Sequence, residues 1–188
     1  MSRKKKIRYP SLNTILLTAI ITLAAGIILI SVYGDRIFKS PYRTHPPKTE
    51  SITVDLYFST EEGPYLKAEK RKIKKGSLET EAAGAVRALL QGPREGLVNT
   101  IPPGTRLNAL RVSDSTAFVD LSSEVVKNHP GGSSGEIETV YSIVNTLALN
   151  FQGINEVQLL VDGKKEETLA GHIDISFPLK PDRKIIKN

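Results

Sequence analysis

Asp120 and Glu124 are the two residues of this sequence whose type and spacing best suit acid–base chemistry. Glycoside hydrolysis uses a pair of carboxylates at a defined separation, on either side of the bond that is cut. The sequence shows neither that separation nor the cleft that a glycan needs, and the simpler interpretation is that Asp120 faces solvent or caps the turn after its strand. We therefore expect no catalytic residues and no enzyme activity.

The histidines, serines and glycines do not predict a catalytic or metal-binding site either. His45, His129 and His172 lack the spacing of metal ligands in motifs such as H-E-x-x-H. His172 with Asp174 is the arrangement that comes nearest to a metal site, and it is a weak one. The glycine-rich stretch 127–135 lacks the lysine of a phosphate-binding loop. Its GGSSG has the spacing of G-x-S-x-G, but it lies in a loop and is not the nucleophile elbow of a hydrolase. We expect no metal and no cofactor.

The segment 92–107, GPREGLVNTIPPGTRL, is better suited to binding than to catalysis. Its glycine and proline turns end one element and begin the next, so most of the segment sets the path of the chain. Arg94 and Arg106 are the basic residues that these turns hold. The functional interpretation is that both arginines flank a partner-binding surface.

Charge and composition narrow the class of protein. The chain has 188 residues and a formal net charge of +6. Residues 1–13 contain no acid and five of the basic residues, namely Arg3, Lys4, Lys5, Lys6 and Arg8. The rest of the chain is therefore nearly neutral, which argues against a nucleic-acid partner. The chain has no cysteine, which excludes disulfides, thiolate metal sites and a lipidated cysteine.

Residues 14–33 form an uncharged apolar run that is long enough to cross a membrane as a helix. A cleaved signal peptide is the alternative, but the apolar region of such a peptide is shorter, about 7–15 residues. The basic tail 1–13 outweighs the charges after the run, which places the N-terminus in the cytoplasm. We predict a single-pass anchor in the cytoplasmic membrane, a proline-containing linker over 34–50, and an extracytoplasmic domain.

The lysine-rich run 67–76, KAEKRKIKKG, has two interpretations. The first is an edge strand whose charges prevent the sheet from pairing with other chains. The second is contact with anionic lipid or a cell-wall polymer. The basic residues 180–188 are predicted to form a solvated tail.

Periodicity predicts the elements of the domain over 51–179. Strands are expected at 52–58, from 65 to about Ile73, at 106–113, at 116–121, at 157–161 and at 173–177. A first helix follows Ser77 as its N-cap and ends at Gly92. A second helix runs to residue 151 and is predicted to begin with a capping box of Ser133 and Glu136.

This order predicts an α+β fold. A helix, two strands, a helix and a strand form the core, in which two helices pack on one face of a small mixed sheet. Flanking strands complete the domain, and one N-terminal transmembrane helix precedes it.

Four motifs in this order are similar to a known family: GPREGLVNTIPPGTRL, AFVDLSSEV, IVNTLALNFQGINEVQLLVDG and GHIDISFPL. They resemble the GerMN (germane) domain of sporulation and spore germination proteins and of bacterial envelope lipoproteins, over residues 51–179. The family core is similar to the ring-building motif of secretion and sporulation channels. Spore-forming members carry two such domains and a lipidated cysteine, whereas this chain has one domain and an apolar anchor.

The resemblance implies a protein that works by association without catalysis. We expect a membrane-anchored interaction module that binds another envelope protein or itself. Binding of peptidoglycan or another cell-wall polymer is the alternative.

Overall fold

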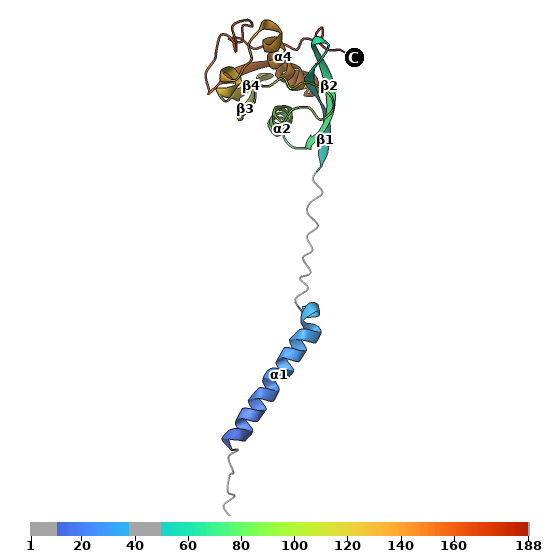
Figure 1. The fold of residues 1–188 in the computed structure, drawn as a ribbon, viewed down its shortest axis with the longest axis vertical. Coiled ribbons are helices and arrows are strands. Elements are labelled where there is room, and N and C mark those ends of the chain that lie inside the picture. The colour runs from blue at the N-terminus through green and yellow to red at the C-terminus, as the bar shows by residue number, and fades with distance from the viewer. Residues whose placement is uncertain (1–10, 38–49, 188) are drawn as a thin grey trace, which may run out of the picture. The chain divides into compact units, whose positions relative to one another are not determined.

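The computed structural model describes residues 11–37 and 50–187. The chain divides into two compact units, Met1–Lys48 and Thr49–Asn188 (Figure 1). Residues 1–10 of the predicted basic tail and residues 38–49 of the predicted linker lie outside the described residues.

The first unit contains one helix, α1 (Leu12–Ile37). Within it, Leu12–Gly34 has a mean hydropathy of 2.7, and by length and composition it can span a membrane. The hydroxyl groups of Thr18 and Thr22 donate to the carbonyl oxygens of Ile15 and Ala19, at 2.8 and 2.9 Å. The hydroxyls of these threonines are therefore hydrogen-bonded within the helix and need no water, which a hydrocarbon environment does not supply. The N-terminal helix is thus an apolar signal or anchor segment, longer at both ends than the predicted 14–33.

The second unit contains two sheets. The first is an antiparallel hairpin of β1 (Ser51–Thr60) and β2 (Gly63–Lys74). The second has the order β3-β4-β5, with β3 (Leu107–Ser113) antiparallel to β4 (Thr116–Leu121) and β4 parallel to β5 (Glu156–Val161). A mixed sheet of this kind results because the connection from β4 to β5 passes through a helix.

The two long helices lie between the hairpin and the three-stranded sheet (Figure 1). Helix α2 (Leu78–Leu90) packs on β1, β2 and β3, and helix α4 (Ser133–Asn150) packs on β1, β2 and β5. One hydrophobic core joins all these elements, including Leu56, Leu89 and Leu147, which are fully buried. Burial of each such side chain stabilises the fold by about 1.5–3 kcal/mol. The predicted α+β class and the order of the core elements are confirmed.

Local sequence explains how these elements begin and end. Ser77 is the N-cap of α2, where its hydroxyl accepts a bond from the amide of Thr80 at 3.4 Å. Gly92 follows this helix with a φ of 80°, which a residue with a side chain rarely adopts. Asp114 and Ser115 both have positive φ, as a two-residue turn of type I′ between β3 and β4 requires.

Three predictions about local structure are wrong. The capping box does not form, since Gly132 is the N-cap of α4 and Glu136 binds elsewhere. Residues 173–177 are not a strand: Ile175 is buried and Phe177 is 68% exposed. These residues form an irregular segment after a turn at Gly171, which has a φ of 93°. The segment contacts β5 where the side chain of Gln158 donates to the carbonyl of Ile175 at 2.8 Å.

The third error concerns the C-terminal residues, which are docked and not solvated. Leu66 of β2 donates to the carbonyl of Ile185 at 2.7 Å and accepts from the amide of Lys187 at 2.8 Å. The side chain of Asn145 on α4 exchanges two bonds with the backbone of Asp182, both 2.9 Å long. The segment is held mainly through its backbone, which composition does not reveal.

A short helix, α3 (Glu124–Lys127), was not predicted. It begins directly after β4 and leads into the glycine-rich loop before α4. At four residues it is too short for hydrophobic periodicity to indicate it.

Candidate functional site

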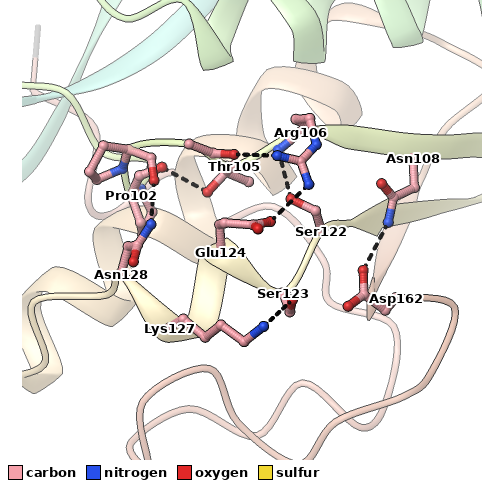
Figure 2. A network of polar contacts seen from close by, with 12 residues as sticks. Pro102, Thr105, Arg106, Asn108, Ser122, Ser123, Glu124, Lys127, Asn128 and Asp162 are labelled. Carbon is pink, nitrogen blue, oxygen red and sulfur yellow. Dashed lines mark hydrogen bonds and ion pairs between the residues drawn. The ribbon is translucent and has the colours of Figure 1, made fainter.

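Arg106 lies just before β3 in a network of polar contacts around α3 (Figure 2). Its guanidinium contacts the carboxylate of Glu124 at 3.3 Å, and its side chain is 67% exposed. Its backbone amide donates to the hydroxyl of Ser122 at 3.0 Å. An ion pair this exposed is weak, because water competes for both partners. Arg106 is therefore available to a binding partner.

The carboxylates considered for catalysis have separate structural tasks. Asp120 accepts a bond of 2.7 Å from the amide of Gly163, in the turn after β5. Glu124 pairs with Arg106, and the hydroxyl of Ser122 is the main group that lowers the pKa of Glu124. A general acid needs the opposite shift. Asp120 thus does cap a turn, although the turn follows β5 and not its own strand.

Arg94 lies in the loop after α2, and this loop is fastened to the hairpin by a buried ion pair. Glu69 and Arg71 of β2 are 8% and 3% exposed and contact each other through a carboxylate oxygen and Nε. Arg71 also donates to the carbonyl of Gly92 at 2.8 Å. The other carboxylate oxygen of Glu69 accepts from the amides of Arg94 and Glu95, at 2.7 and 3.3 Å.

The ion pair is ionised as well as buried. Burial of Glu69 opposes its negative charge, but the bonds from the Arg94 amide and the Arg71 guanidinium outweigh burial and lower the pKa of Glu69. The guanidinium also lies 6.0 Å from the ring centre of Phe58. The pair therefore fixes the backbone of the loop, and the Arg94 side chain remains exposed at the surface.

Arg94 and Arg106 lie in two different parts of the domain. Arg94 sits beside β2, and Arg106 sits between α3 and β3; no contact joins them among the described residues. A depression of about 500 Å³ runs beside Arg94, between Lys67–Lys70 of β2 and the loop residues 94–97. If both arginines bind a partner, the contact surface must include more than one patch.

Glu136 is the most completely buried acid in the described chain, with 0% exposure. Its carboxylate accepts from the amides of Leu169, Ala170 and His172, at 2.8–2.9 Å. The His172 ring nitrogen Nδ1 lies 3.2 Å from the same carboxylate. Burial raises the pKa of Glu136, but these amide bonds prevail, so the pKa is lowered overall. Glu136 organises the irregular segment after β5.

His129 and His172 serve the loops around α4. The Nδ1 of His129 accepts from the amide of Gly131 at 3.0 Å, while Nε2 lies 3.2 Å from the hydroxyl of Thr139. Burial lowers the pKa of His129, consistent with a neutral ring. In residues 11–37 and 50–187, no three histidine or acidic side chains gather as metal ligands. His45 lies outside the described residues.

Comparison with known proteins now decides the family. The model of the family described as "Germane: Sporulation and spore germination" matches residues 55–167, more than half of the chain. This chain belongs to the Germane family. The comparison with curated proteins finds no match.

Three solved structures have the fold of this Germane domain. A candidate lipoprotein from Clostridium perfringens is 28% identical, with a TM-score of 0.51, and the match covers 69% of this chain and 87% of that one. The tandem GerMN domains of the sporulation protein GerM from Bacillus subtilis are 25% identical, with a TM-score of 0.58 and coverage of 70% and 46%. The first GerMN domain of that protein is 23% identical, with a TM-score of 0.53 and coverage of 71% and 98%.

The chain thus spans about half the length of the tandem protein and nearly all of its first domain. It is a protein of the sporulation and spore germination family with an N-terminal apolar helix. It has no cysteine, so the lipid anchor of a bacterial lipoprotein has no attachment residue in this sequence.

The buried charges of the Germane domain are what sequence reasoning missed. Glu69 and Arg71 alternate with Lys70 and Lys72, and they occupy the inward face that Ile73 also shares. An acid and a base two apart on the buried side of a strand are a signal for an internal ion pair. For Glu136 a signal existed as well, but it was interpreted as local capping.

Proposed function

We propose that this Germane protein is a non-enzymatic interaction module, anchored in the cytoplasmic membrane with its domain outside the cytoplasm. It joins a cell-envelope assembly, in sporulation or germination, by binding another envelope protein or a second copy of itself. Anchoring through α1 supports this function, because confinement at one membrane raises the effective concentration of other anchored proteins.

The proposal rests on the bonding partners of the buried charged residues. Three charged residues are buried in the described chain, Glu69, Arg71 and Glu136, and each bonds the protein's own backbone. Catalysis by a buried acid or base requires such a group to face a substrate. Here the charges that remain free lie on the surface, where they suit the recognition of a partner.

In-cell photo-crosslinking of the full-length protein tests the proposal. A photoreactive amino acid replaces Arg94 in one variant and Arg106 in a second, and it replaces the exposed Lys164 in a control. We expect self-crosslinks or a reproducible envelope protein from Arg94 or Arg106, identified by mass spectrometry. Crosslinks at none of the positions, or to glycan alone, would contradict a protein-interaction role.

Binding of a cell-wall polymer is the second candidate, favoured by the exposed lysines on one face of β2. Lys70, Lys72 and Lys74 alternate along this strand and are all exposed. Sedimentation of the detergent-solubilised chain with purified cell wall, in low and high salt, tests this function. Salt-sensitive sedimentation supports it, since screening weakens contacts between exposed charges, and its absence argues against it.

A further inference from the structure

The outer edge of β2 is open along most of its length. In an antiparallel pair, alternate residues direct their backbone N–H and C=O groups away from the partner strand. Leu66 does so, because both of its groups bond the C-terminal segment and not β1. The register with β1 is regular from Leu66 to Lys74, so Ala68, Lys70 and Lys72 also direct these groups outward. None of them has a backbone partner among residues 11–37 and 50–187.

The C-terminal segment shows that this edge accepts a strand. Ile186 pairs with Leu66 in the parallel direction, and Figure 1 shows the C-terminal end beside the hairpin. The pairing reaches only one residue of β2 and leaves the edge from Ala68 to Lys74 uncovered. The opposite edge of the hairpin is covered from Asp55 to Ser59: the amides of Asp55 and Tyr57 on β1 donate to side chains of α4, and Ser59 pairs with Val98.

Most of the exposed charged side chains along the open edge are positive. Lys70, Lys72 and Lys74 line its solvent side, and only Lys70 has an acidic partner in the described chain, Asp55 at 3.3 Å. Lys67 and Lys70 also line the depression beside this edge, together with Arg94 and the acid Glu95. A strand added here would place alternate side chains next to these lysines.

We propose that the β2 edge, from Ala68 to Lys74, binds an extended acidic segment of a partner protein by strand addition. This proposal rests on the proposed interaction function and names the chemistry of the partner. Backbone bonds to Ala68, Lys70 and Lys72 supply the pairing, and acids at alternate positions pair with the lysines. A second copy of β2 is disfavoured at this edge, because its own lysines would lie beside these.

A lipid or polymer is the weaker occupant of the same edge. Phosphate or carboxylate groups would satisfy the lysines, but such a ligand would not supply the alternating donors and acceptors of a strand. The lysines therefore exclude other lysine-rich edges and admit an acidic one, which combines protection of an open edge with selection of a partner.

Amide hydrogen exchange of the full-length chain in detergent micelles tests the pairing directly. The probe is a synthetic peptide of alternating glutamate and valine, about as long as the stretch from Ala68 to Lys74. Without peptide, we expect fast exchange at Ala68, Lys70 and Lys72 and slow exchange at Glu69 and Arg71. Peptide must protect the three fast amides in the bound state. Binding without this alternating protection would overturn the proposal.

Modified peptides separate strand pairing from simple charge attraction. N-methylation of the peptide amides that face β2 should weaken binding by about tenfold or more, because each methyl group removes a backbone hydrogen bond. N-methylation of the alternate amides, which face away, should leave binding unchanged. Equal effects of the two patterns would show that no strand is added.

Charge variants test the role of the lysines. Lys72→Glu combined with Lys74→Glu should lower affinity for the acidic peptide about tenfold, through like charges across the new pair. The control, Lys164→Glu combined with Lys165→Glu, makes the same charge change in an exposed turn and should leave affinity unchanged. A peptide of alternating lysine and valine should bind the Lys72 and Lys74 variant better than the unmodified chain. Rescue of this kind requires a folded edge, so its absence in a variant with native circular dichroism would contradict the proposal.

Different results would contradict strand addition at the β2 edge and the proposed interaction function. Vesicles that contain anionic phospholipid serve as the competing probe, and binding to them without binding of the acidic peptide would overturn strand addition. Crosslinks from Arg94 or Arg106 to an envelope protein would then still support the interaction function. Absence of all protein crosslinks would count against that function itself.

Discussion

The two turns that carry Arg94 and Arg106 are built in opposite ways. The backbone of the Arg94 loop is fastened by the buried pair Glu69–Arg71, whereas the Arg106 turn is bordered by an exposed pair with Glu124. Buried charges are costly to leave without a partner, and exposed ones are not. The first loop therefore depends on electrostatics for its structure, while the second depends on proline, glycine and backbone bonds and leaves its arginine exposed at the surface.

Glu69→Ala is expected to reduce the stability of the domain more than the other substitutions below. The change leaves the buried Arg71 guanidinium without a counter-charge and two loop amides without an acceptor, so it should lower the free energy of unfolding by about 3 kcal/mol. Urea denaturation of the detergent-solubilised chain, followed by near-UV circular dichroism of the tyrosines, measures it. The neighbouring Lys70→Ala is the control and should behave like the unmodified chain. Equal stability of both variants would show that the buried pair does not hold the loop.

Glu136→Gln should have the next largest effect. The amide side chain keeps the shape of the carboxylate but brings NH₂ hydrogens toward three backbone amides that need acceptors. A loss of about 2 kcal/mol of unfolding free energy is expected. Hydrogen exchange of Leu169, Ala170 and His172 should accelerate in this variant while that of β1 is unchanged. Uniform acceleration across the domain would instead indicate a global effect.

Acidification should reduce the stability that the carboxylates of Glu69 and Glu136 both contribute to the folded domain. The folded state lowers the pKa of both carboxyls, so the stability that they contribute is complete above their unfolded pKa of about 4.3. It is lost as the pH falls further, through the folded pKa values, because the unfolded chain then binds more protons. Since burial also lowers the pKa of His129, some loss begins near pH 6.5.

Urea denaturation at a series of pH values from 7 to about 3 measures this dependence. The double variant Glu69→Gln with Glu136→Gln should be less stable at neutral pH and should lose less stability on acidification. A slope below pH 5 as steep as that of the unmodified chain would show that other groups govern acid unfolding.

Arg106→Ala is expected to have the smallest effect on stability. Its guanidinium is exposed and its ion pair with Glu124 is solvated, so the urea midpoint should not change measurably. Crosslinking to a partner through the Arg94 position should weaken if both arginines serve one interface. A marked loss of stability would mean that this turn, too, depends on its charge for structure.

Sequence patterns predicted most of the fold, with errors at places where an acid or an irregular segment has distant partners. Alternation located β1, β4 and β5, and helical spacing located α2 and α4, because each of these elements buries one face in the same core. The two-residue turn at Asp114 and Ser115 located β3. The same rules failed for residues 173–177, where apolar spacing of two reflects contacts of a loop. They failed for Glu136, whose partners lie more than thirty residues away.

The candidate site was predictable in part. Arg94 and Arg106 follow from the turns that hold them, and both are exposed as a binding role requires. The fastening of the Arg94 loop to β2 was not predicted, since Glu69 lies in a run that reads as lysine-rich. The open edge of β2 depends on which strands pair and in which register, and a strand sequence does not specify its neighbours.

The sequence by itself determined the elements of this protein, its apolar N-terminal helix and its Germane family, because these follow from local periodicity and from ordered motifs. Only the tertiary structure decided which charges are buried, that helices α2 and α4 lie between two sheets, and that the C-terminal segment covers one end of β2 and leaves the rest open. The physical reason is that backbone pairing and burial are set by contacts between residues far apart in the chain, and no local pattern contains them.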